Sequence, residues 1–267
     1  MARRAEKDMS EKDKTALEIG PRFVQETSYY DFSQTGRRKG EPQPIPFWTA
    51  EKGMETVLLP PWQQALPSSC LWTAMEKRRS RRTYAQEALE IQALSCLCGV
   101  TQGIEKEIVF NGNATLRPVP SAGAKHAIET IVLVRRVKGL APGLYRYLAK
   151  EHALGWLGET TSDWLCALDT AFTSNRFQHN SAVTFFWIAV PERMVWHHGQ
   201  RGYRNLYLDA GHIGQNFYLA AEGLGLAACT MCVFDDVSMK RLLGLEGDQF
   251  LVYTAAAGQR QPEPAAP

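Results

Sequence analysis

The most regular pattern of the chain lies in GQRGYRNLYLDAGHIGQNFYLAAEGLGL, residues 199–226. Apolar side chains recur every three or four positions from Leu206 to Leu224, which is the spacing of one face of an α-helix. Glycines at positions 223 and 225 end the pattern, as they commonly do at helix C-termini. The stretch predicts a long helix over about 203–224, in which three small residues would let another backbone approach closely: Ala210, Gly211 and Gly214.

The segments on both sides of this helix show strand and helix patterns in an irregular order. Runs rich in β-branched and other apolar residues predict strands at 127–137, 182–190, 226–234 and 250–258, and a hairpin at 142–157. Helical spacing returns at 89–98 and 237–245. Because these elements follow no steady strand–helix–strand rhythm, the expected fold class is α+β rather than doubly wound.

The 267 residues are enough for one large domain with an extension. Residues 1–15 alternate in charge and predict a disordered N-terminal tail. Residues 16–70 mix aromatic residues with prolines and show no helical or strand period, which predicts an extended arm. We expect this arm to wrap a partner subunit, the main domain to span 71–262, and 263–267 to form a C-terminal tail.

Composition and missing motifs exclude several classes of protein. A net charge of +2 argues against a general binder of polyanions such as nucleic acid. The N-terminus lacks the apolar core of a signal peptide, and no apolar run reaches the ~20 residues of a membrane span, which predicts a cytoplasmic protein without membrane contact. The P-loop, the Rossmann glycine fingerprint and the nucleophile elbow of serine hydrolases are absent.

No metal site is expected. His197 and His198 are adjacent, so on a helix or strand their side chains should point apart and make poor co-ligands. Cys229 and Cys232 form a C-x-x-C, but no second pair stands at a zinc-site spacing. We expect these two thiols to be packed within an apolar strand.

The densest charge lies in EKRRSRRTY, residues 76–84. Its arginines and its serine suit a phosphate group, because guanidinium groups bond phosphate bidentately and keep their charge. The block precedes the predicted helix at 89–98, whose free backbone N–H groups could add to anion binding. A solvated basic start of a helix explains the same residues equally well, so both interpretations stay open at this point.

Four motifs in order carry a resemblance to a known family. The arginine block and the following Thr-Tyr resemble the R-R-S-x-R-x-[FY] signature of the FMN-dependent nitroreductase superfamily. LRPVPSAGAKHAIE (116–129), the stretch 199–226 and FDDVSMKRLLGL (234–245) resemble its SagB-type dehydrogenase branch. The resemblance covers about residues 50–262. It implies a mixed sheet of four to five strands flanked by helices, in an intertwined homodimer with FMN at the interface.

The resemblance also implies roles for individual residues. The FMN phosphate would be held by Arg78, Ser80 and Arg82, with Arg79 near the flavin or its ribityl chain and Arg260 as a further basic group. A loop from the other subunit would contact the isoalloxazine ring through Pro120, Ser121, Ala122 and Gly123. Backbone near flavin N5 would come from Met231, Cys232 and Val233.

The expected activity is that of an FMN-dependent oxidoreductase, which passes hydride through flavin N5 from a donor such as NAD(P)H to a small organic acceptor. Azoline oxidases of the branch carry a Lys-Tyr pair where this chain has His197 and His198. These histidines are the candidate catalytic residues, since histidine titrates near neutral pH. One alternative is a peptide azoline-to-azole dehydrogenase that uses oxygen as acceptor, and another is a non-enzymatic module that binds nucleic acid through residues 78–82.

Overall fold

The computed structural model of the chain describes residues 11–28, 32–68, 70–110, 112–173 and 177–262. Its centre is a seven-stranded sheet in the order β1-β6-β5-β4-β7-β9-β8, and every neighbouring pair is antiparallel. The strands are β1 (Thr56–Leu58), β4 (Ile128–Val134), β5 (Gly143–Leu148), β6 (Ala153–Gly158), β7 (Val183–Ala189), β8 (Leu226–Met231) and β9 (Phe250–Gln259). A separate hairpin pairs β2 (Lys106–Val109) with β3 (Asn113–Leu116).

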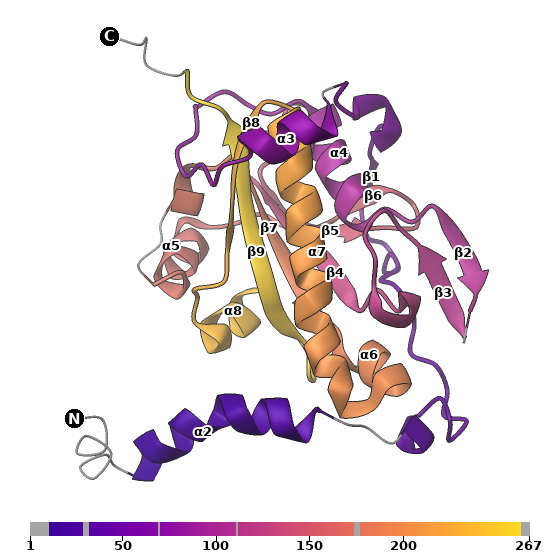
Figure 1. Cartoon of the computed structure of the whole chain (residues 1–267). Coiled ribbons are helices and arrows are strands. Elements are labelled where there is room, and N and C mark those ends of the chain that lie inside the picture. The colour runs from indigo at the N-terminus through magenta and orange to yellow at the C-terminus, as the bar shows by residue number, and fades with distance from the viewer. Residues whose placement is uncertain (1–10, 29–31, 69, 111, 174–176, 263–267) are drawn as a thin grey trace.

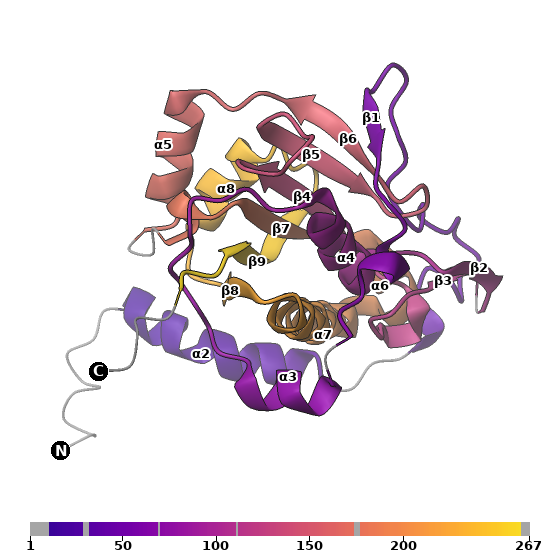
Figure 2. The same ribbon diagram turned by 90° about the horizontal axis from the view of Figure 1, so that it is seen from above.

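Helices cover both faces of the sheet (Figures 1 and 2). One face packs against α4 (Ile91–Gln102) and the long α7 (Gly202–Gly223), and the other against α5 (Ser162–Ala171) and α8 (Asp236–Leu242). Strands β4 and β7 are buried along their whole length, as two-sided covering requires. The α+β class with flanking helices is therefore confirmed, whereas the predicted sheet of four to five strands in mixed directions is wrong.

Most elements lie where the sequence predicts them. The long helix, the strands of the main domain and the helices at α4 and α8 begin and end within a few residues of their predicted limits. A short additional helix, α3 (Leu71–Lys77), precedes the arginines, and α6 (Pro191–His198) leads into α7. Because α3 ends at residue 77 and α4 begins at residue 91, the arginine block does not lie at the start of a helix, and that part of the sequence interpretation is wrong.

The N-terminal region differs from its prediction. Residues 1–10 of the predicted tail lie outside the described residues, while its last five residues open a helix, α2 (Glu11–Glu26). The arm is thus helical at its start, and farther along it contributes β1 to the edge of the sheet beside β6. Figure 1 shows α2 projecting from the body near α6, where Arg201 donates hydrogen bonds to the carbonyl oxygens of Thr27 (2.7 Å) and Ser28 (2.8 Å).

Within the described part of the chain, no helix is both long enough and apolar enough to cross a membrane. The predicted C-terminal tail, 263–267, lies outside the described residues.

Among the contacts that hold the arm against α4, the closest packing involves Trp62. Trp62 of the arm lies over Gly99, and a Cβ on Gly99 would sit 2.1 Å from Trp62 Cγ. We expect Gly99→Ala to displace this ring and to lower the free energy of unfolding by about 1–3 kcal/mol, the usual cost of overpacking. Gln92→Ala is the control, because Gln92 is an exposed residue of the same helix α4, where alanine is at least as good a helix former and the change should be neutral or stabilising. Urea unfolding of both variants tests this, and equal stabilities would contradict it.

Candidate functional site

The arginine block is an extended segment that runs beside β8. The backbone N–H of Arg81 donates to the carbonyl oxygen of Ala228 at 2.9 Å, and that of Ala85 donates to the carbonyl of Gln259. Tyr84 is buried and packs on Gly258, where an added Cβ would lie 3.0 Å from Tyr84 Cβ. These contacts fix the backbone of the segment. The side chains at positions 78–82 leave this backbone in different directions, because each contacts a different part of the protein.

Two of the predicted phosphate-binding residues gather around Tyr218 of α7. The guanidinium of Arg78 lies over the Tyr218 ring, 5.0 Å from its centroid, and Ser80 Oγ is 2.9 Å from the Tyr218 hydroxyl. The same hydroxyl accepts a 2.9 Å hydrogen bond from the backbone N–H of Thr230 in β8. Tyr218 thus joins the arginine segment to β8, a connection that the sequence analysis did not find because Tyr218 looks like one more residue of an amphipathic helix.

Two further arginines bind Glu222, one turn farther along α7. Arg81 and Arg260 both bind its Oε2, at 2.6 and 3.1 Å, and the carboxylate side chain is only 8% exposed. The structure therefore brings Arg260 from the end of the chain to the arginine segment. It also shows Arg81, which the sequence analysis did not select, as an anchored part of the cluster.

Arg79 and Arg82 lie apart from this cluster. Arg79 is exposed and donates to the carbonyl oxygens of Glu76 (2.8 Å) and Arg78 (2.9 Å). The Arg82 guanidinium lies 5.5 Å from the ring centroid of Phe177, in contact with a different part of the chain. The arginines thus each contact other groups of the protein instead of forming one solvated basic face.

The residues predicted near flavin N5 follow directly on β8. Thr230 contacts Tyr218, and Met231 ends the strand with its carbonyl oxygen bonded to the Thr254 hydroxyl at 3.3 Å. Cys232 and Val233 come after the strand and are exposed. This places the segment beside the Tyr218 cluster, but the expectation that both thiols of the C-x-x-C pack within a strand holds only for Cys229.

The predicted flavin-contacting loop is anchored by Asp209, a buried residue of α7. Ser121 Oγ donates to Asp209 Oδ2 at 2.6 Å, the N–H of Ala122 approaches Oδ1 at 3.3 Å, and the N–H of His126 donates to Ser121 Oγ at 2.9 Å. Burial raises the pKa of Asp209, although the bonds from Ser121 and Ala122 act in the opposite direction. A lone acidic residue within the apolar stripe of a helix is the sequence signal that could have revealed it.

The histidine pair lies against the same loop. An added Cβ on Gly123 would be 3.0 Å from His198 Nε2 and 3.1 Å from His197 Cδ2, and Gly123 has a φ of +61°, in the left-handed region that suits glycine. The two imidazole centroids are only 4.5 Å apart. The expectation that adjacent histidines point apart is wrong here, because α6 ends at His198, whose φ of −113° and ψ of 0° depart from helical geometry.

The environment keeps both histidines uncharged near neutral pH. Burial lowers the pKa of His197 to about 4, and the charges of His198, Lys125 and Arg37 add to the effect. Burial also lowers the pKa of His198, against the opposing effect of a hydrogen bond to the backbone of Ala122. Both rings are therefore neutral imidazoles at pH 7, able to accept a proton.

The two halves of the predicted site lie on opposite faces of α7. Asp209, which holds the loop, and Tyr218, which holds the arginine segment, are nine positions apart. At 3.6 residues per turn this is about 2.5 turns, which puts them half a turn apart around the helix and roughly 13.5 Å apart along it. One chain therefore does not bring the arginine segment and the loop 120–123 to a single ligand.

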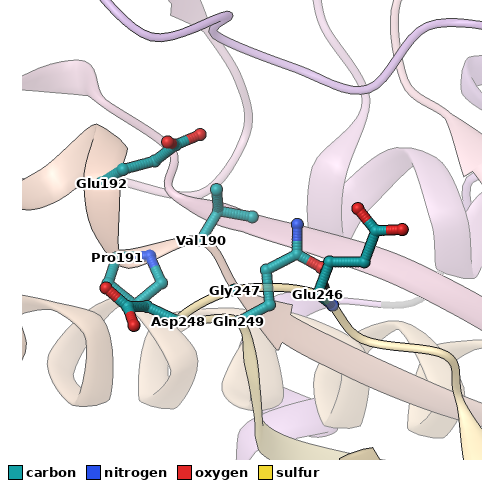
Figure 3. Close-up of a pocket in the computed structure, with 7 residues that line it drawn as sticks. All are labelled: Val190, Pro191, Glu192, Glu246, Gly247, Asp248 and Gln249. Atoms are coloured by element: carbon teal, nitrogen blue, oxygen red, sulfur yellow. Dashed lines mark hydrogen bonds between the residues drawn. The ribbon is translucent and has the colours of Figure 1, made fainter.

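A separate acidic hollow of about 380 Å³ lies between the start of α6 and the loop before β9. Figure 3 shows the carboxylates of Glu192, Glu246 and Asp248 around it. None of the predicted site residues lines it, and its negative charge does not suit a phosphate group. Over the described residues, no group of three or more histidine, cysteine or acidic side chains could hold a metal ion.

The fold and these motifs define a class of protein. The model of the Nitroreductase family matches residues 75–259, more than half of the chain, and the chain belongs to this family. It is accordingly a nitroreductase-family oxidoreductase that uses FMN, which rules out the non-enzymatic nucleic-acid-binding module considered for residues 78–82.

Individual relatives agree with this assignment. A Methanocaldococcus jannaschii protein named as a nitroreductase, MJ1384, is 31% identical over 170 residues, 64% of this chain and 82% of the relative. The trifolitoxin-processing protein TfxB of Rhizobium leguminosarum bv. trifolii is 34% identical over 119 residues, which cover 43% of this chain but only 32% of TfxB.

Solved structures show the same fold. A nitroreductase-like protein of Ralstonia eutropha superposes with a TM-score of 0.62 at 19% identity, over 83% of this chain and 97% of that one. A chain of the Escherichia coli microcin synthetase McbBCD complex superposes with a TM-score of 0.56 at 17% identity, over 90% and 86% of the two chains. At these identities the superpositions establish the fold alone.

The lowered histidine pKa values make stability depend on pH. An unfolded histidine titrates near 6.5, whereas burial lowers the pKa of folded His126 to about 3 and that of His197 to about 4. The unfolded chain therefore binds more protons between these values, so the free energy of unfolding should fall as pH drops from about 6.5 to 4 and stay level above 6.5. Urea unfolding across this range should show a shallower fall for His126→Asn, and the wild-type slope for Gln92→Ala, which removes no titratable group. Identical slopes in wild type and His126→Asn would contradict the prediction.

Proposed function

We propose that the chain is a SagB-type, FMN-dependent oxidoreductase that transfers hydride between a donor such as NAD(P)H and a small organic acceptor. Bound FMN would supply the redox chemistry, as an acceptor and donor of hydride. The chain's own residues would hold the phosphate, present a close-fitting backbone to the ring and carry protons. These roles are assigned from the two groups of residues that contact α7: the arginine segment at Tyr218 and Glu222, and the loop 120–123 with the histidine pair near Asp209.

The observation that carries the proposal is the cluster on the C-terminal half of α7. Arg78, Ser80, Arg81 and Arg260 converge there from two segments that lie far apart in the sequence. Three guanidinium groups and one hydroxyl form a donor set suited to a phosphate dianion. The single carboxylate among them, Glu222, orients two of the arginines and leaves the cluster net positive. The residues present therefore fit the FMN phosphate, with Arg79 and Arg82 in peripheral positions.

The second half of the proposed site would come from another copy of the chain. The loop 120–123 and the histidines face away from the arginines of their own chain, so a homodimer is the simplest arrangement that joins the two halves. Exposed apolar side chains on α3 and α7 provide surface for such an interface, among them Trp72 (72% exposed), Tyr207 (55%) and Leu208 (63%). Of the small residues on α7, Gly211 has open space around it and could admit the partner, whereas Gly214 is used within the chain against Tyr253.

A peptide-modifying dehydrogenase is the second candidate. In this version the substrate peptide gives up hydride and oxygen accepts it. Two similarities favour it: the relative TfxB is named for processing trifolitoxin, and the McbBCD complex that shares the fold was solved with truncated pro-MccB17 bound. Anaerobic bleaching of the flavin by NADH or NADPH would favour the first candidate, and bleaching only by a peptide would favour the second.

Removal of one arginine tests the phosphate site. We expect denatured wild-type protein to release about one FMN per chain, and Arg78→Ala to bind FMN roughly 10- to 100-fold more weakly, since a charged hydrogen bond contributes about 1.5–3 kcal/mol. Arg241→Ala, at an exposed position on α8, is the control and should bind FMN as the wild type does. Absence of flavin from the wild type, even after incubation with FMN, would refute the proposed function.

Mixed dimers test the two-chain arrangement. Arg78→Ala damages the phosphate half, and Gly123→Val damages the loop half, because a side chain there would meet both histidines. A dimer of one chain of each kind would contain one site with both halves intact, so it should recover about half of the wild-type FMN content and activity. Recovery requires that each site take its halves from different chains. Mixed dimers as inactive as the two parents would show that each site lies within one chain.

A further inference from the structure

Four hydroxyl groups form a hydrogen-bonded row that ends at the arginine segment. The hydroxyl oxygens of Tyr253 in β9 and Thr230 in β8 are 2.6 Å apart. The Thr230 hydroxyl donates to that of Tyr218 at 3.2 Å, and Tyr218 in turn lies 2.9 Å from Ser80 Oγ. Ser80 is exposed, so a ligand can reach the outer end of this row.

The donors and acceptors along the row fix the direction of its hydrogen bonds. Each hydroxyl has one hydrogen to donate. The Tyr218 oxygen accepts two hydrogen bonds, from the backbone N–H of Thr230 at 2.9 Å and from the Thr230 hydroxyl. Its own hydrogen therefore goes to Ser80 Oγ, which is the acceptor in that contact. The hydrogen of the Ser80 hydroxyl then remains available to a ligand.

The surroundings of Ser80 suit a donor that points at an anion. The guanidinium of Arg78 lies over the ring of the same Tyr218, and Arg81 and Arg260 lie one turn farther along α7. A serine hydroxyl turned the other way would present its lone pairs to the ligand and repel negative charge. Hydrogen bonds in a row also polarise one another, which strengthens the last donor. The row thus adds an oriented neutral donor to the arginine cluster.

We propose that Tyr218 is a positioning residue of the phosphate site, whose hydroxyl holds that of Ser80 as an outward donor to the FMN phosphate. The inference rests on the proposed function. Tyr218 acts through Ser80, so its effect on binding disappears when the Ser80 hydroxyl is removed. It acts on the phosphate alone, so it affects FMN and leaves riboflavin, which has the same ring and ribityl chain without the phosphate, unaffected.

A pair of substitutions tests whether Tyr218 acts through Ser80. Tyr218→Phe removes the hydroxyl and keeps an aromatic ring beneath Arg78. In flavin-free protein we expect this variant to bind FMN about 3- to 10-fold more weakly than the wild type, the contribution of one hydrogen bond. Ser80→Ala should weaken binding at least as much, and the double variant should bind FMN as Ser80→Ala does. Losses that multiply in the double variant would overturn the proposal, because the two hydroxyls would then act independently.

Riboflavin tests whether the effect is confined to the phosphate. Tyr218→Phe should bind riboflavin with the affinity of the wild type. Tyr203→Phe is the control, because it removes a hydroxyl from the first turn of the same helix, roughly 22 Å from Tyr218 along its axis, and should bind both flavins as the wild type does. If Tyr218→Phe weakens FMN and riboflavin equally, its effect is a general disturbance of the protein and the proposal is wrong.

Inorganic phosphate separates this role from the proposed function. Calorimetric titration of the flavin-free wild type should show phosphate binding, and Tyr218→Phe should weaken it by the same factor as FMN binding, but only when Ser80 is present. A wild type that binds phosphate but no FMN refutes the proposed function, while the same comparison of variants with phosphate still decides the role of Tyr218. A wild type that binds neither refutes both.

A second variant covers the case that Tyr218→Phe fails to fold. Replacement of Tyr218 by 3-fluorotyrosine keeps the hydroxyl and its contacts and makes the phenol a stronger donor. It should tighten phosphate binding about twofold through the row, and leave binding unchanged in the Ser80→Ala background. An unchanged affinity in the presence of Ser80, or the same gain without its hydroxyl, overturns the proposal.

Discussion

The rotation of α7 on the sheet is the constraint on which the rest of the site depends. Gly214 meets Tyr253 of β9 so closely that an added Cβ would lie 2.7 Å from the ring. Because successive side chains leave a helix at fixed angles, this contact directs Tyr218 and Glu222 toward β8 and the arginines, and Asp209 toward the loop 120–123. If α7 were rotated by half a turn, its two faces would be exchanged. The arginine segment would then be separated from Tyr218 and Glu222, and the loop 120–123 from Asp209.

The two faces of α7 contact residues of different charge: a positively charged arginine cluster on one face and uncharged groups on the other. On one, guanidinium groups are fixed by an aromatic ring and by Glu222, so that their charge is present before any phosphate binds. Preorganisation of this kind reduces the entropy lost on binding. On the other face, a loop of small residues lies beside two imidazoles that burial and neighbouring cations keep neutral. The proposed function would use both, the guanidinium groups to hold the cofactor phosphate and the neutral imidazoles to gain or lose a proton.

The errors of the sequence interpretation share a physical cause. Local patterns predict the long helix, the central strands and the α+β class, because burial on one or two faces imposes periods of 3.6 or 2 on the chain. The arm was misjudged because Gly20 and Pro21 interrupt the helical spacing of apolar residues in α2, and because β1 is only three residues long. Strand directions were misjudged because pairing depends on contacts between distant segments, such as β1 with β6, that no local pattern records.

For the site, the sequence by itself determined which residue types are present: an arginine cluster, a small-residue loop, a histidine pair and a basic residue after the last strand. Their motifs were enough to indicate the family. Only the tertiary structure decided their partners, because hydrogen bonds and charges act over a few ångströms in space whatever the separation along the chain. It joined Arg260 to Arg81 through Glu222, Ser80 to β8 through Tyr218, and Gly123 to the histidines.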